Sequence, residues 1–209
     1  MVEGALASGL LIALEGIDGC GKSTQADRLV LWLRERDPGR PVTLLREPGG
    51  TALGEGVREL LLQGAERGPL TEMLLYMACR SELYHAAVLP ALSRGEVVLL
   101  DRSHFSTAAY QGAGLMQDEA AIFAYAKVVT YGREIDKVVL LQLEPELAEA
   151  RRQGESDHIE SRGLPYFRRV AEAYARYAEE RPEQFMTVDA SKGADEVFAQ
   201  ICSGLADVV

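Results

Sequence analysis

Short apolar runs alternate with longer amphipathic stretches along this chain of 209 residues. The runs fall at residues 10–15, 41–46, 96–101, 137–143 and 185–189, and apolar residues recur at helical spacing between them. This alternation is typical of parallel strands joined by crossover helices. We therefore predict an α/β fold with a five-stranded parallel sheet flanked by helices on both faces. We expect a single domain over residues 1–209.

A glycine-rich segment joins the first apolar run to the first amphipathic helix. Its glycines let consecutive N–H groups surround a polyphosphate, and the helix that follows adds its positive dipole end. A lysine supplies a mobile charge for the outer phosphates, and the next serine offers a hydroxyl to Mg²⁺. The segment matches G-x-x-x-x-G-K-[ST], and its residues are Gly16, Ile17, Asp18, Gly19, Cys20, Gly21, Lys22, Ser23 and Thr24. The sequence predicts a P-loop NTPase fold with a bound nucleoside triphosphate.

Two further stretches add to this pattern. A long helix is predicted from near Pro69 to residue 92, and Pro90 marks its end. The segment 151–162 is almost wholly polar, is rich in arginine and lies between two predicted helices. It is either a solvated loop or a mobile lid over the phosphates, and the P-loop favours the lid.

Composition narrows the range of partners. The net charge of −10 leaves no basic surplus to neutralise a phosphate backbone, so we expect no nucleic-acid partner. The first apolar run is too short to span a membrane, and we expect no membrane partner. Cys20, Cys79 and Cys202 are odd in number and far apart, which fits a reducing cytosol better than disulfides or a zinc site. We expect a cytoplasmic protein.

Charged residues follow two of the predicted strands, at the edge where α/β proteins bind ligands. Asp101 can hold Mg²⁺ or its water shell, and Arg102 can bind an acceptor phosphate. The segment Arg46–Thr51 follows the second strand and combines a proline with two glycines. The chain contains no asparagine, so it lacks the Asn-Lys-x-Asp segment with which many nucleotide switches read guanine. Arginines spread over several segments suit phosphoryl transfer instead.

Five segments of the chain form a recognisable set: Glu15–Gln25, Arg46–Thr51, Tyr76–Arg80, Asp101–Arg102 and Ser106–Gly112. Together they resemble the thymidylate kinase family. Their order and spacing hold from about residue 9 to the end of the chain, and the combination of Arg-Glu-Pro-Gly-Gly-Thr with Ala-Tyr-Gln-Gly is the specific part. The resemblance implies transfer of the γ-phosphoryl group of ATP to dTMP, giving dTDP and ADP with Mg²⁺.

The resemblance also implies roles around the phosphates. Lys22 would span the donor and transferred phosphates, with Ser23 or Thr24 on the metal. Asp18 would contact the sugar and phosphate region of the acceptor. The acceptor phosphate would be held by three arginines with a glutamate near the metal: Arg46, Arg58, Arg102 and Glu47.

A second set of residues that match the family pattern would recognise the nucleoside. Tyr76 takes the position that stacks on thymine, although its helical pattern would also suit a core aromatic. Arg80 would donate to thymine O4, where cytosine carries a donor, and would thereby reject cytosine. Thr107 and Gln111 would form hydrogen bonds with the remaining polar groups of thymine. Tyr110 would lie against the sugar 2′ position and so favour deoxyribose.

The chain departs from the family pattern in four places, one of which is His158, where the family usually has arginine. Ser103 stands where the family often has an aromatic residue, and Tyr76 stands where phenylalanine is more frequent. Gly19 in the P-loop implies that the catalytic arginine comes from the lid, which is short in this chain. The candidates for that arginine are Arg151 and Arg152, with Arg162 as a third.

Other functions stay open at this point. A kinase for another pyrimidine monophosphate such as dUMP would share the phosphate sites, and a deoxynucleoside kinase would not need the extra arginines. A non-catalytic nucleotide sensor would account for the short lid. The family implies a homodimer, with the predicted helices at 69–92 and 117–131 as candidate interface elements.

Overall fold

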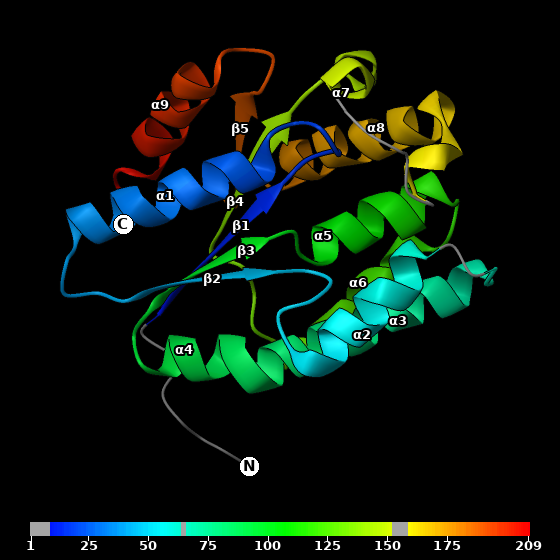
Figure 1. The fold of residues 1–209 in the computed structure, drawn as a ribbon, viewed down its shortest axis with the longest axis horizontal. Coiled ribbons are helices and arrows are strands. Elements are labelled where there is room, and N and C mark those ends of the chain that lie inside the picture. The colour runs from blue at the N-terminus through cyan, green and yellow to red at the C-terminus, as the bar shows by residue number, and fades with distance from the viewer. Residues whose placement is uncertain (1–8, 64–65, 152–158) are drawn as a thin grey trace.

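The computed structural model describes residues 9–63, 66–151 and 159–209. All five strands run parallel in one sheet of order β2-β3-β1-β4-β5 (Figure 1). They are β1 (Leu10–Glu15), β2 (Val42–Arg46), β3 (Val97–Asp101), β4 (Lys137–Gln142) and β5 (Phe185–Asp189). The predicted α/β class and five-stranded parallel sheet are confirmed, and no strand boundary differs from its prediction by more than one residue.

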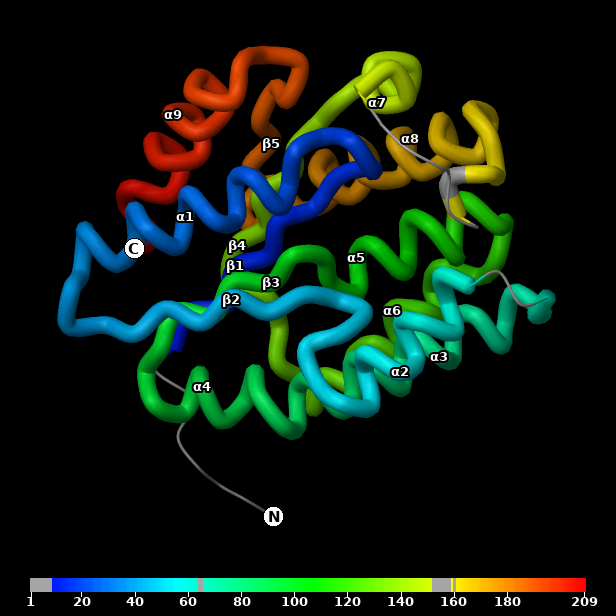
Figure 2. Tube along the Cα trace, viewed as in Figure 1, coloured from blue at the N-terminus to red at the C-terminus, as the bar shows by residue number. Residues whose placement is uncertain are grey.

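Helices connect successive strands. α1 and α9 lie side by side on one side of the sheet, and the helices from α2 to α6 lie on the other (Figure 2). The α-helices are α1 (Lys22–Arg36), α2 (Ala52–Leu62), α3 (Pro69–Leu83), α4 (Leu89–Ser93), α5 (His104–Thr107), α6 (Glu119–Val129), α7 (Pro145–Arg151), α8 (Leu164–Glu180) and α9 (Ala194–Leu205). Two π-helical segments, η1 (Tyr84–Val88) and η2 (Ala108–Gly114), and a 3₁₀ turn, η3 (Glu160–Arg162), complete the described elements.

The burial of the strands shows that both faces of the sheet are covered. In β1 the residues from Leu11 to Leu14 are 0% exposed, and β3 and β4 each bury four consecutive residues. Such continuous runs are what a strand between two layers of helices requires. The edge strand β2 instead alternates between buried and more exposed positions. The core therefore centres on β1 and its two neighbours.

The long helix predicted from residue 69 is helical throughout, but it consists of three pieces. α3 passes into the π-helical turn η1, whose closing hydrogen bond joins Leu89 N–H to the Tyr84 carbonyl. Pro90, which has no N–H to donate, is then accommodated in the first turn of α4. The helix continues to Ser93, so Pro90 precedes its end by one short turn.

The parallel register brings three functional segments to one edge of the sheet. Asp101 at the end of β3 pairs with Leu14 of β1 and with Arg46 of β2. The P-loop, the Asp101–Arg102 pair and the Arg46–Thr51 segment therefore begin side by side. None of the helices described above is long and apolar enough to cross a bilayer.

We predict that Ile12→Ala in β1 lowers the free energy of unfolding by about 2–5 kcal/mol, because Ile12 is 0% exposed and its removal leaves a cavity. Urea denaturation would measure the loss. The control is Leu44→Ala in the edge strand, where 37% exposure predicts a change below about 1 kcal/mol. Equal losses in the two variants would contradict the assignment of the core to β1.

Candidate active site

Two adjoining pockets open at the carboxyl edge of the sheet. The larger, of about 430 Å³, is lined by the P-loop and by charged residues from β2, α2 and β3. The smaller, of about 100 Å³, lies between α3 and η2 and is lined largely by aromatic and polar side chains. Both pockets are lined by Asp18, Glu47, Arg58 and Arg102. A ligand that filled both would therefore pass these four residues.

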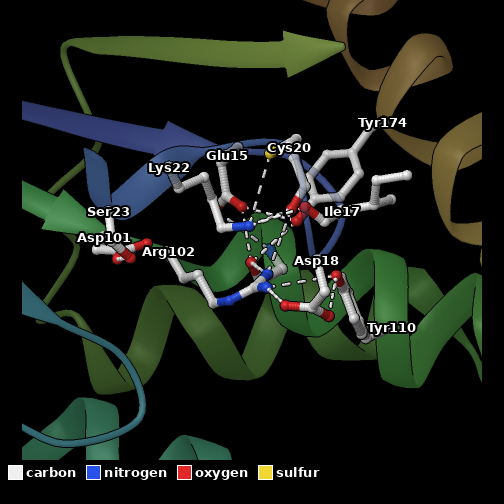
Figure 3. Close-up of polar contacts among 12 residues, drawn as sticks. Glu15, Ile17, Asp18, Cys20, Lys22, Ser23, Asp101, Arg102, Tyr110 and Tyr174 are labelled. Atoms are coloured by element: carbon white, nitrogen blue, oxygen red, sulfur yellow. Dashed lines mark hydrogen bonds and ion pairs between the residues drawn. The ribbon is translucent and has the colours of Figure 1, made fainter. Parts of the chain in front are cut away.

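The P-loop wraps around the amino group of its own lysine. Lys22 Nζ donates to the carbonyls of Gly16 and Ile17, both at 3.0 Å (Figure 3). Gly16 has φ +139°, and a Cβ there would lie 2.5 Å from the Leu141 carbonyl, so a side chain would not fit. The P-loop residues that line the larger pocket are Asp18, Gly19, Gly21, Lys22, Ser23 and Thr24, whereas Gly16, Ile17 and Cys20 lie behind them.

Hard oxygen ligands suitable for Mg²⁺ meet at the base of the larger pocket. Ser23 Oγ donates to Asp101 Oδ2 at 3.0 Å, which joins the P-loop to the end of β3. No group of three His, Cys, Asp or Glu side chains with metal-binding geometry occurs among the described residues. The two oxygen ligands of Ser23 and Asp101 are what a Mg²⁺ site needs from the protein, because this ion is usually held by one or two protein oxygens together with substrate phosphates.

Asp18, Arg102 and Tyr110 form a cluster where the two pockets meet (Figure 3). Arg102 Nη2 contacts Asp18 Oδ1, and the Tyr110 hydroxyl donates to Asp18 Oδ2 at 2.8 Å. The Arg102 guanidinium also lies over the Tyr110 ring at 5.0 Å. Burial alone would raise the pKa of Asp18, but Arg102, Lys22 and the Tyr110 hydroxyl outweigh it and lower that pKa to about 2. Asp18 is therefore ionised at neutral pH and holds Arg102 in place.

The other two predicted phosphate-binding arginines lie on the far wall of the larger pocket. Arg46 Nη2 pairs with Glu55 Oε2 at 2.9 Å, and Arg58 Nη1 donates to the Pro48 carbonyl at 3.0 Å. Glu55 also accepts from the Gly50 N–H at 2.8 Å, so it ties the Arg46–Thr51 segment to α2. Arg46, Arg58 and Arg102 all line this pocket together with Lys22.

Arg80 is enclosed between the smaller pocket and the core, with a relative exposure of 1%. Its Nε donates to Glu47 Oε2 at 2.7 Å, and its Nη2 donates to Thr107 Oγ1 at 2.9 Å. Nη1 makes only a weak contact with the Met77 sulfur at 3.4 Å, so it retains donor capacity for a ligand. Glu47 Oε1 has no hydrogen-bond partner in the described part of the chain. A ligand donor could therefore satisfy it.

The remaining predicted base contacts line the same pocket. Tyr76 of α3 and both Tyr110 and Gln111 of η2 line it. Tyr110 is only 5% exposed, and its ring packs edge-on against Tyr166 and Phe167. The structure therefore brings together all nine residues that were predicted to bind the acceptor: Arg46, Glu47, Arg58, Tyr76, Arg80, Arg102, Thr107, Tyr110 and Gln111.

The candidate lid arginines are dispersed. Arg151 donates to the carbonyls of Ala190 and Ser191 at 2.7 and 3.0 Å and lines neither pocket. Arg152 lies outside the described residues. Arg162 contacts both carboxylate oxygens of Glu72, at 2.8 and 3.0 Å. The assignment of a catalytic lid arginine therefore stays a prediction.

Sequence reasoning missed several residues that shape the site. Glu15 is 0% exposed at the end of β1 and accepts from Ser103, Ser106 and Tyr174 at 2.6–2.7 Å. Glu72 likewise accepts hydrogen bonds from Gln111 and Arg162. The only available signal was an acidic residue within or next to an apolar run, which in both cases marks a paired buried carboxylate.

A family model described as thymidylate kinase matches residues 14–201. The chain belongs to the thymidylate kinase family. A thymidylate kinase from Deinococcus radiodurans is 42% identical over 97% of this chain and 98% of that protein. One from Hahella chejuensis is 39% identical over 96% of this chain and 98% of that protein.

A solved structure of the thymidylate kinase from Ehrlichia chaffeensis has a similar fold. It superposes with a TM-score of 0.81 at 27% identity, over 94% of this chain and 98% of that one. The predicted P-loop NTPase fold is thereby confirmed, as is the resemblance to the thymidylate kinase family.

Asp18→Asn tests the electrostatics of the cluster. Because the pKa of Asp18 is lowered to about 2 in the folded protein, its carboxylate stabilises the fold fully above about pH 4. We expect the wild type to exceed the variant in free energy of unfolding by a constant amount from pH 7 to pH 4, and by less as the pH falls toward 2. Denaturant titrations at several pH values would measure this. A wild-type advantage that instead grows as the pH falls from 7 to 4 would mean that the pKa is raised, because the folded state would then bind the proton more tightly than the unfolded chain.

Proposed function

We propose that this chain transfers the γ-phosphoryl group of ATP to dTMP in the two pockets described above, giving dTDP and ADP. Membership of the thymidylate kinase family supports this function, and the alternatives of a different pyrimidine kinase or a nucleotide sensor are not favoured. The observation that carries the proposal is the junction at Asp18 and Arg102. A P-loop pocket and a pocket with pyrimidine-matching polar groups meet there.

Positioning and charge neutralisation supply most of the catalysis in phosphoryl transfer. The P-loop N–H groups and Lys22 would bind the ATP phosphates, for which Lys22 would leave the Gly16 and Ile17 carbonyls. Arg46, Arg58 and Arg102 would hold the acceptor phosphate. Their present partners Glu55, Pro48 and Asp18 support this role because they limit the side chains to a few orientations.

No strong general base is required, since a phosphate monoester is largely ionised at neutral pH. Ser23 and Asp101 would hold Mg²⁺, with Glu47 close by. The ion would supply positive charge to the phosphate oxygens. A lid arginine from the 151–162 segment would complete the set of cations and help to exclude water.

Discrimination among nucleosides would come from the smaller pocket. A free N–H on Arg80 Nη1 would donate to thymine O4, and the Tyr76 ring would stack on the base. Tyr110 would favour deoxyribose, because its hydroxyl is held by Asp18 and its ring is packed against two neighbouring rings. Such a ring cannot move to admit a 2′-hydroxyl.

A homodimer also belongs to this proposal. Exposed leucines recur on helices that pack against one another: α2 carries Leu53 and Leu60, and α3 carries Leu70 and Leu74, all between 48% and 59% exposed. Tyr125 and Val128 extend this apolar face along α6, which packs against α3. A second copy of the chain would cover it around a twofold axis. The expected cytoplasmic location stays a prediction.

A coupled ADP-release assay with Mg-ATP tests the acceptor. We expect turnover to be strongest with dTMP, weaker with dUMP and much weaker with dCMP, and none with thymidine, which has no phosphate for the arginines. Lys22→Met should reduce turnover on the order of 100-fold. Equal rates with dTMP and dCMP would contradict the pyrimidine assignment, and dTMP binding without turnover would favour a sensor.

For the homodimer, we expect the wild-type mass at micromolar concentration to be twice 22.8 kDa in sedimentation or light-scattering measurements. Leu74→Glu should shift the mass to that of the monomer, because it places a charge within the apolar face. Leu31→Glu is the matched control, since Leu31 is 61% exposed on α1, on the other side of the sheet. A monomeric wild type, or dimer loss in the control alone, would contradict this interface.

A further inference from the structure

A second carboxylate, Glu72, lies beneath the smaller pocket and joins three segments of the chain. It is on the first turn of α3 and is only 3% exposed. Arg162 of η3 contacts both of its oxygens, at 2.8 and 3.0 Å, and Arg67 Nε lies 3.4 Å from Oε2. Gln111 Nε2 of η2 donates to Oε1 at 2.9 Å. Glu72 is thus the common partner of the lid end and of a pocket residue.

This contact fixes which end of the Gln111 amide can face a ligand. An ionised carboxylate only accepts hydrogen bonds, so Gln111 must present its NH₂ group to Glu72. Gln111 is 1% exposed and lines the pocket, and its Oε1 accepts no hydrogen bond from the residues that the structure describes. The side-chain oxygen Oε1 of Gln111 is therefore the group that can accept a hydrogen bond from the ligand.

Arg162 provides the charge that keeps Glu72 ionised. Burial raises the pKa of a carboxyl group, but hydrogen bonds from Arg162 and Gln111 and the charge of Arg67 outweigh that effect and lower the pKa of Glu72. Tyr76 and Tyr166 are the other titratable groups near this carboxylate, and both stay neutral because burial raises their pKa values. Arg162 is itself held by the Tyr166 hydroxyl at 3.2 Å, which in turn donates to the Tyr110 carbonyl at 3.1 Å.

We propose that Glu72 is a positioning residue for base selection. By accepting from the Gln111 NH₂ group, it turns Gln111 Oε1 toward the base, and Arg162 is the counter-charge of the Glu72 carboxylate. The inference rests on the proposed base pocket. Thymine offers O4 as an acceptor next to N3–H as a donor, which matches a donor on Arg80 and an acceptor on Gln111. Cytosine offers the reverse pattern, an amine beside an unprotonated N3. If the Gln111 amide could rotate, one of the two mismatches with cytosine would disappear.

Glu72→Gln tests the proposal, because an amide of the same shape can either donate or accept and so frees Gln111 to rotate. We expect the ratio of kcat/KM for dTMP to kcat/KM for dCMP to fall at least about tenfold, with the dCMP value itself unchanged or increased. Glu96→Gln is the control: Glu96 is a 7% exposed carboxylate paired with Arg94 just before β3, remote from the pocket. That variant should keep the wild-type ratio.

Equal reductions of kcat/KM for dTMP and dCMP in Glu72→Gln would show a merely structural role and overturn the proposal. If that variant fails to fold, Arg162→Gln provides the test. Without its counter-charge Glu72 would bind a proton more readily, so the dTMP to dCMP ratio should fall between pH 8 and pH 6 while the wild-type ratio stays constant. A ratio independent of pH would overturn the proposal. A wild type that uses dCMP as readily as dTMP would instead overturn the base pocket itself.

Discussion

The site depends on one buried carboxylate, Glu15, at the end of the central strand. A fully buried acid is costly unless its oxygens are satisfied, and here Ser103, Ser106 and Tyr174 supply the donors. These donors come from the segment after β3 and from α8. They therefore fix the wall that carries Thr107, Tyr110 and Gln111 in relation to the P-loop. Ser103, one of the residues that depart from the family pattern, belongs to this network and caps α5.

A residue with a strained backbone conformation lies at the junction of the two pockets. Arg102 has φ +75°, a left-handed conformation that L residues other than glycine rarely adopt. Its N–H is held by the Leu14 carbonyl at 3.0 Å, and its side chain reaches Asp18, Gly16 and Ser106. These contacts together stabilise the left-handed conformation of Arg102. The result is a guanidinium held at the boundary between the two pockets, directly after the strand that also provides Asp101.

The sequence predicted the strands and the P-loop well because both are local patterns. A buried parallel strand must be an apolar run, and a phosphate loop must have its glycines and lysine at fixed spacing. The predicted acceptor residues also gathered in two pockets, because most of them follow strand ends or lie on the helices beside them. The pairing of Glu72 with Arg162 escaped prediction, because the two residues are 90 residues apart in the sequence and lie on different elements. Arg162 was considered only as a lid arginine, and no local pattern connects it to Glu72.

The pairing of cations with carboxylates decides how the site can bind anions in a chain of net charge −10. Four cationic and three acidic side chains line the larger pocket, so its own excess charge is small. A weak overall field cannot supply strong attraction, and affinity must come from directed donors held at short range. Asp18 orients Arg102, and Glu55 orients Arg46. Each carboxylate also neutralises part of the charge of the arginine that it orients. Lys22 and Arg58 donate to backbone carbonyls in place of carboxylates, so a phosphate would displace only neutral acceptors from them. A group that offers several acceptor oxygens in a fixed geometry, as a phosphoryl group does, would match these directed donors.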